Sequence, residues 1–152
     1  MFTPLPRRAT HLVLVFFCAS LMSVGSGFAA GENVPKPAGV SIELNALDEQ
    51  SGACRISFLV ENRYGEDIGQ AVYETVLFNP QGQVARLTLF DFQSLPSQRP
   101  RVRQFQIDGL ACNDIGRILI NGADTCTGDG LPPNACQDGL DLKSVTMVEL
   151  VG

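Results

Sequence analysis

Short runs of alternating apolar and polar residues constrain this sequence more than any other feature. In the run CRISFLVEN, residues 54–62, one face of an extended strand carries Cys54, Ile56, Phe58 and Val60, and the other carries Arg55, Ser57 and Glu61. Further β-rich runs follow roughly every ten to fifteen residues, separated by turn residues such as the NPQG stretch at 79–82. No segment shows a sustained 3.6-residue apolar period, so the chain is predicted to be all-β.

About seven strands are predicted, over residues 40–47, 54–62, 70–79, 83–90, 101–108, 115–122 and 143–150. The run 70–79 is apolar on both faces and is expected to be a central strand. The apolar positions move from one strand face at Val102 to the other face at Phe105 and Ile107, which indicates a bulge near Gln104. Short strands with regular turns favour an immunoglobulin-like antiparallel β-sandwich over a small closed barrel.

The N-terminal segment predicts export. MFTPLPRR carries two arginines and no acid, an apolar run covers residues 12–24, and the small-residue stretch GSGFAA follows. This order is typical of a cleaved secretory signal, and the apolar run is shorter than the roughly 20 residues of an ordinary spanning helix. We predict a signal peptide over 1–29, with cleavage after Ala29 or Ala30. An extended linker over 30–38 and one domain over 39–152 should follow, in a periplasmic or secreted protein without stable membrane insertion.

The expected mature chain is acidic and has no histidine. The net charge of the whole sequence is −5, and removing Arg7 and Arg8 with the signal takes it to −7. This balance disfavours nucleic acid, because Lys and Arg must neutralise its phosphates. The single histidine, His11, lies in the predicted signal, which excludes a Ser-His-Asp triad, a Cys-His dyad and an imidazole metal site. We therefore expect a protein that is not an enzyme and that binds an unknown protein or an anionic small molecule.

Four cysteines follow the predicted signal: Cys54, Cys112, Cys126 and Cys136. An even number in an oxidising compartment indicates disulfides, for which three pairings are possible. Cys54 lies on an apolar strand face and Cys112 leads into a later strand, which favours Cys54–Cys112 across the core and Cys126–Cys136 within a loop. Redox and zinc chemistry are disfavoured, because the spacings are neither C-x-x-C nor paired short spacings.

An acidic loop at 121–141 is the candidate cation site. Its aspartates offer the hard oxygen ligands that Ca²⁺ prefers, namely Asp124, Asp129, Asp138 and Asp141. The stretch DTCTGDG is not an EF-hand pattern, however, and the same residues also cap turns in solvated loops. Calcium-dependent binding is therefore an alternative function, and no other cofactor is expected.

Two further groups of charged residues suggest chemistry. Arg99, Arg101 and Arg103 form the basic cluster of an acidic domain and could bind an anionic partner, although such residues also protect edge strands from pairing. An acid-residue hydrolase is a second alternative, and it would use a carboxylate pair. Its candidates are Glu61, Glu66, Asp67 and Glu74.

The stretches CRISFLVEN, FNPQGQVAR and RVRQFQIDGLACNDIGRILIN, within residues 40–136, resemble those of small exported proteobacterial proteins. Such proteins are often labelled only by a twin-arginine or other signal sequence and are otherwise uncharacterised. The resemblance implies a periplasmic location and structural cysteines, and it implies no activity. Arg7-Arg8-Ala-Thr-His departs from the twin-arginine pattern, so both export routes are open. The leading hypothesis is a disulfide-stapled periplasmic β-sandwich that works as a non-catalytic binding or interaction module.

Overall fold

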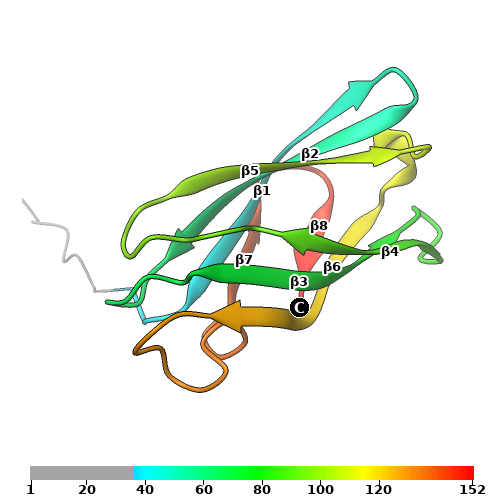
Figure 1. Ribbon diagram of the computed structural model, residues 1–152. Helices are drawn as coiled ribbons and strands as arrows, with labels where there is room; N and C mark the ends of the chain where they lie inside the picture. Colours follow the sequence, from blue (N-terminus) through cyan, green and yellow to red (C-terminus); the bar gives the residue numbers. More distant parts are fainter. Residues whose placement is uncertain (1–35) are drawn as a thin grey trace, which may run out of the picture. The chain divides into compact units, whose positions relative to one another are not determined.

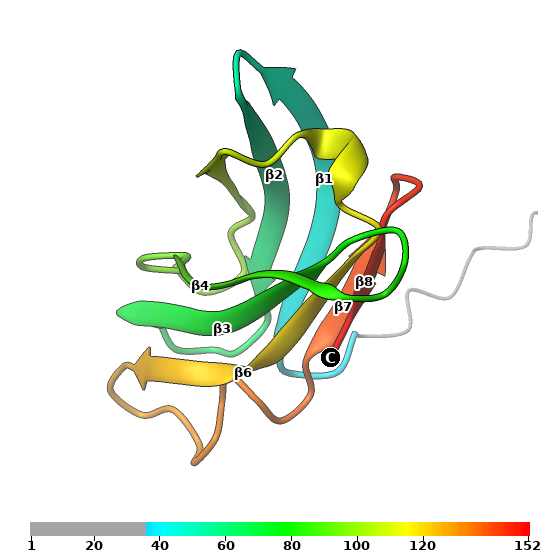
Figure 2. The same ribbon diagram turned by 90° about the vertical axis from the view of Figure 1, so that its right-hand side faces the viewer.

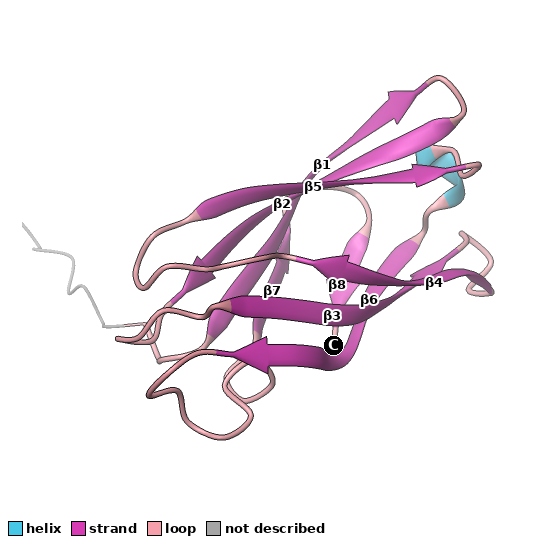
Figure 3. Ribbon diagram, in the orientation of Figure 1, coloured by secondary structure: helices cyan, strands magenta, loops and turns pink. Residues whose placement is uncertain are grey.

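A computed structural model of the protein describes residues 36–152, which form two four-stranded sheets packed face to face (Figure 1). One sheet has the strand order β5-β2-β1-β7 and the other β4-β3-β6-β8. Figure 3 shows that strands and loops make up nearly all of this region. The elements are β1 (Val40–Gln50), β2 (Ala53–Asn62), β3 (Gln70–Phe78), β4 (Val84–Asp91), β5 (Arg101–Asp108), η1 (Cys112–Asp114), β6 (Arg117–Thr127), β7 (Asp141–Ser144) and β8 (Glu149–Val151). The predicted signal peptide at 1–29 and most of the predicted linker lie outside the described residues.

The first six strands have an immunoglobulin-like arrangement. Strands β1, β2 and β5 lie in one sheet and β3, β4 and β6 in the other, so the chain passes repeatedly between the layers (Figure 2). All pairs among these six strands are antiparallel. The predicted all-β, immunoglobulin-like sandwich is confirmed, and the run 70–79 is central as expected, because β3 lies between β4 and β6.

The predicted strand at 143–150 is two short strands. β7 pairs with β1 and β8 pairs with β6, both in parallel, so the chain changes sheet between them. The Ser144 hydroxyl accepts a hydrogen bond from the Thr146 N–H (3.1 Å) and donates one to the Val148 carbonyl (2.6 Å). A serine that satisfies the backbone groups of a turn in this way lets the chain reverse without Gly or Pro. Alternation of residue types does not reveal such a turn.

The bulge predicted near Gln104 is absent. β5 pairs with β2 in continuous register along Ala53–Val60. Phe105 and Ile107 pack toward the core, whereas Val102 lies on the outer face and is 61% exposed. The change of parity in the sequence comes from one apolar residue on the outer face, and no inserted residue is needed.

An aromatic cluster joins the two sheets where β4 and β5 lie near each other. The ring of Phe58, on β2, lies 5.8 Å from that of Phe90 and 5.5 Å from that of Phe92. Phe105 on β5 stacks on Phe90 on β4, with ring centroids 4.2 Å apart. Apart from Phe105, these rings are buried, and they contribute much of the apolar area that stabilises the sandwich.

Two disulfides fasten the sandwich, with the pairing that the strand positions favoured. Cys54–Cys112 links β2 to η1, and Cys126–Cys136 links the end of β6 to the following loop. Disulfides of this kind are compatible with an exported protein. In the part of the chain that the structure describes, no helix has the length and hydrophobicity needed to cross a bilayer.

Candidate functional site

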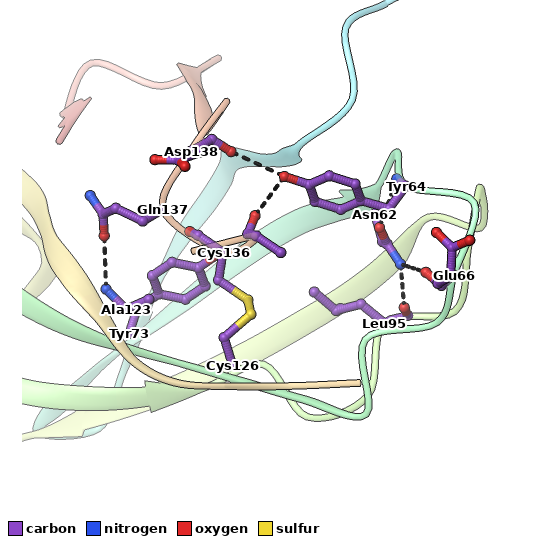
Figure 4. The surroundings of a disulfide bond; sticks show 11 residues. Asn62, Tyr64, Glu66, Tyr73, Leu95, Ala123, Cys126, Cys136, Gln137 and Asp138 are labelled. Atoms are coloured by element: carbon purple, nitrogen blue, oxygen red, sulfur yellow. Dashed lines mark hydrogen bonds between the residues drawn. A yellow bond between two sulfur atoms is a disulfide. The ribbon is translucent and has the colours of Figure 1, made fainter. Parts of the chain in front are cut away.

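The acidic loop after β6 is fastened to the sandwich at several points (Figure 4). The Cys126–Cys136 disulfide closes it, and the hydroxyl of buried Tyr73 donates a hydrogen bond to the Cys136 carbonyl (2.9 Å). The Tyr64 hydroxyl donates to two further carbonyls of this loop, at 3.0 and 3.2 Å. Burial raises the pKa of the Tyr73 phenol above its ordinary value, so Tyr73 stays a hydrogen-bond donor. The loop is therefore part of the rigid scaffold.

The four aspartates predicted as calcium ligands do not converge. Asp141 binds the guanidinium of Arg63 (2.8 Å) and the ammonium of Lys143 (3.0 Å), while Asp124 is exposed on β6 and accepts a hydrogen bond from Thr125. The hydrogen bond from Lys143 lowers the pKa of Asp141 most; burial opposes this effect and Arg63 adds to it. Within residues 36–152, no group of three or more His, Cys, Asp or Glu side chains could hold a metal ion.

The three predicted partner-binding arginines have different surroundings. Arg103 donates from Nε to the Phe92 carbonyl (2.6 Å) and from Nη2 to the Ser94 carbonyl (2.9 Å), so it holds the segment that follows β4. Arg101 donates to the neighbouring carbonyl of Pro100, and Arg99 is exposed. Arg103 thus has a structural task, and docking through these arginines stays a prediction.

The carboxylates suggested for a hydrolase are also divided. Glu66 and Asp67 line an open hollow of about 750 Å³ together with Asp129, between the β2–β3 loop and the end of β6. Asp67 accepts a hydrogen bond from the Ser97 N–H (2.7 Å), so it supports a neighbouring loop. The other two candidates lie elsewhere, Glu61 beside Arg63 (3.3 Å) and Glu74 beside Asn121.

An apolar row crosses the outer face of the sheet β4-β3-β6-β8, and it was not expected from the sequence. Leu87, Val76, Leu119 and Val151 are register partners, one from each strand in turn. Leu87 is 58% exposed and Val151 38%, while Val76 between them is covered by its neighbours at 7%. Leu89, two residues along β4, is 52% exposed on the same face. We call these five residues the apolar strip.

Unpaired carboxylates flank the apolar strip on one side. Glu74 and Asp91 lie on the outer face of β3 and β4, and Glu74 shares a shallow hollow of about 240 Å³ with Asp124. None of these three forms an ion pair within the described residues. On the other side, Arg117 and Glu149 neutralise each other at 3.0 Å. The surface around the strip is therefore negative on one side only.

β4 has one open side. Antiparallel partners alternate between hydrogen-bonded and non-bonded pairs, and the Phe92 N–H donates to the Ala71 carbonyl (2.8 Å) just beyond the end of β4. Together with the register of β3 and β4, this bond shows which residues of β4 form the hydrogen-bonded pairs: the backbone N–H and C=O groups of Arg86, Thr88 and Phe90 point toward β3. The backbone N–H and C=O groups of Leu87 and Leu89 therefore point away from β3, toward the open side.

The other edge strands are short or guarded. β7 has four residues and β8 has three, which leaves little backbone for another chain to pair with. β5 follows Pro100 and carries Arg101 and Arg103 on its inward face, the kind of residues that discourage edge pairing. β4 has eight residues, as β5 has, and it carries a single inward-facing arginine, Arg86, with neither Lys nor Pro. β4 is therefore the less protected of the two long edges of the described sandwich.

The sequence held a weak signal for this surface. The run VARLTLF has apolar residues at both parities, Leu87 and Leu89 on one face and Phe90 on the other. A strand that is apolar on both faces is expected to be central, as β3 is, unless a partner covers one face. Only the position of β4 at a sheet edge shows that Leu87 and Leu89 are uncovered.

Comparisons with known proteins support the fold alone. No family model and no curated protein matches the chain. A solved structure of IrmA from Escherichia coli is similar, with a TM-score of 0.54 and 14% sequence identity, and the similarity covers 70% of this chain and 92% of that one. The sandwich is thus shared with a proteobacterial protein. The resemblance to exported proteins labelled by a signal sequence stays a prediction.

Proposed function

We propose that this protein is a periplasmic binding module without catalytic activity, and that its partner docks on the outer face of the sheet β4-β3-β6-β8. The apolar strip carries the proposal, because contiguous exposed apolar residues with a polar rim are typical of interaction sites. Leu87 and Leu89 are its most exposed members, so they have the most apolar area to bury against a partner and should contribute most to binding.

The remaining features support this role. Two disulfides suit an oxidising compartment, and the export signal expected at the N-terminus would deliver the chain there. Residues 36–152 contain no histidine, and several of the candidate catalytic carboxylates are occupied in ion pairs or loop hydrogen bonds. The observed groups suit a scaffold that presents a surface better than they suit a catalytic centre.

Photocrosslinking in the exporting cell tests the docking face. A photoreactive residue replaces Leu87, and a matched control places it at Val102, which is equally exposed on the outer face of the other sheet. We expect a crosslinked partner from position 87 and none from position 102. Adding Leu89→Lys should weaken the crosslink about tenfold or more, because burying a leucine contributes about 1.5–3 kcal/mol.

The predicted arginine contact needs a variant that leaves the fold intact. Arg103 holds two carbonyls, so its substitution would disturb the segment after β4, whereas Arg99→Glu changes an exposed side chain. Loss of the partner with Arg99→Glu and not with Leu89→Lys would contradict docking on the apolar strip. Recovery of the protein outside the periplasmic fraction, or with thiols that label without reduction, would contradict the proposed location.

A further inference from the structure

We infer that the partner contributes an extended segment that adds to β4 as a fifth strand, with two apolar residues and then a Lys or Arg at alternate positions. This inference deepens the proposed binding function and rests on it. It goes beyond the docking face, because it specifies the backbone conformation and the side chains of the occupant.

The backbone of β4 supplies the first argument. The N–H and C=O groups of Leu87 and Leu89 point to the open side, at the spacing that another strand would match. Peptides that extend an exposed sheet edge gain affinity from such main-chain hydrogen bonds, and they gain specificity from alternate side chains. β7 and β8 are too short to offer this, and β5 carries two inward-facing arginines after Pro100, whereas β4 carries one.

The side chains of β4 supply the second argument. Leu87, Leu89 and Asp91 lie at alternate positions and therefore on one face of the strand. An added strand would place its own alternate residues beside them on the same face. Apolar residues next to Leu87 and Leu89 would extend the apolar strip from four strands to five, and would cover its most exposed members.

Charge supplies the third argument and fixes the end of the pattern. A residue beside Asp91 would face Asp91 itself. Glu74 lies diagonally from Asp91 on β3, because its register partner is Leu89, and Asp124 shares a hollow with Glu74. The described structure gives none of these carboxylates an ion pair with a Lys or Arg. A Lys or Arg at this position gains attraction, and an acidic residue is repelled. The partner pattern is therefore basic-x-apolar-x-apolar if the added strand is antiparallel to β4, and its reverse if it is parallel.

Synthetic peptides test the inference on the oxidised, isotope-labelled mature protein by nuclear magnetic resonance. The probes have the cores Lys-Thr-Val-Thr-Val and Val-Thr-Val-Thr-Lys, each flanked by Gly-Ser. We expect one of them, at millimolar concentration, to shift the amide signals of Leu87 and Leu89 and to slow their hydrogen exchange. Glu in place of Lys should weaken binding about two- to fivefold or more, as for an exposed ion pair made repulsive.

Backbone methylation separates strand addition from simple apolar contact. In an antiparallel pair, the amides of the two valines would bond to Leu87 and Leu89, so N-methylation of the valines should abolish binding, and N-methylation of the threonines should not. A parallel strand would show the opposite dependence. Asp91→Asn keeps the acceptor for the Gln93 N–H (2.7 Å) and should weaken only the peptides that carry Lys.

Three results would overturn strand addition. They are unchanged exchange at Leu87 and Leu89 with every peptide, equal binding of both N-methylated forms, and equal binding of the Lys and Glu peptides to the wild type. A crosslink from position 87 in cells would still stand in each case, so the failure of this inference is distinguishable from the failure of the proposed function.

Discussion

Single tyrosine hydroxyl groups hold the acidic loop in which the sequence predicted a candidate cation site. Tyr73 is fully buried, and its hydroxyl satisfies the Cys136 carbonyl, which is itself out of reach of solvent. Tyr64 makes equivalent bonds nearer the surface. A buried carbonyl without a donor is costly, so the two tyrosines should differ in importance.

Tyr73→Phe should lower the free energy of unfolding by about 1–3 kcal/mol, because it leaves the Cys136 carbonyl buried without a donor. Tyr64→Phe is the matched control and should cost less, since water can replace its more exposed bonds. Urea denaturation at pH 7 compares the two. Equal costs, or a neutral Tyr73→Phe, would mean that the hydroxyl does not fasten the loop.

The pKa of Tyr73 also predicts a pH dependence. Burial raises it above the unfolded value of 10.0, so the folded state holds the phenolic proton more tightly than the unfolded state. The resulting stability is fully present below pH 10 and is lost as the pH rises above it. Between pH 9 and about 11, the wild type should lose more stability than Tyr73→Phe, as measured by urea midpoints. Parallel losses would contradict this.

Asp141 predicts the opposite pH dependence. Lys143 and Arg63 lower its pKa below the ordinary 3.8, so its ion pairs stabilise the fold above that pH. Their contribution is lost as the pH falls through the lowered pKa. Asp141→Asn should therefore be less stable than the wild type at pH 7, and the difference should shrink toward pH 2. A difference that is constant with pH would assign the effect to packing.

Edge position is the feature that matters at the scale of a strand. β3 and β4 have similar apolar content, yet β3 has neighbours on both sides and β4 on one. The same kind of sequence is therefore buried in one strand and presented to a partner in the other. β7 and β8 show a related effect, because one run of residues serves two sheets by turning at Ser144.

Hydrogen exchange can verify the open side of β4 without any ligand. The amides of Thr88 and Phe90 bond to β3 and should exchange slowly, whereas those of Leu87 and Leu89 face solvent and should exchange fast. The central strand β3 is the internal control, because its amides should be protected at both parities. Uniform protection along β4 would show that its free side is already covered.

Two disulfides that close loops of very different length stabilise the sandwich as a whole. Cys54–Cys112 has a sequence separation of 58 residues and Cys126–Cys136 one of 10, and each disulfide has one buried cysteine in the core, Cys54 or Cys136. In the chain-entropy model, a disulfide lowers the entropy of the unfolded chain, which stabilises the folded state by about 4 kcal/mol for the longer loop and about 3 kcal/mol for the shorter one. The first disulfide should therefore matter more for the fold, and the second should matter mainly for the acidic loop.

Replacing each disulfide by two alanines tests this order. Cys54→Ala/Cys112→Ala should lower the free energy of unfolding by about 1 kcal/mol more than Cys126→Ala/Cys136→Ala, because it opens the longer loop while each variant removes one buried sulfur. Urea denaturation of the two variants under identical conditions gives the comparison. The reverse order would mean that the acidic loop supports the sandwich more than its contacts indicate.

Much of the fold could be predicted from the sequence, because the relevant forces act between near neighbours. Alternation places Ile56 and Phe58 on one strand face, and Asn79 with Pro80 specifies a turn. The parity of Cys54 also favoured its pairing with Cys112. The candidate site could not be predicted in the same way. Arg103 looked available for a partner and instead holds two carbonyls, which lie close only after folding.

The sequence by itself determined the fold class and most strand positions, since a period of two and a turn residue are properties of the local chain, and it favoured the cysteine pairing that the structure has. The tertiary structure alone decided which strands lie at the edges and which outer face stays uncovered. The alternating pattern predicts that Leu87 and Leu89 lie on the same strand face, but it does not predict whether another part of the protein packs on that face. Neighbours distant in the chain decide this, and at β4 the described sandwich provides none on the open side.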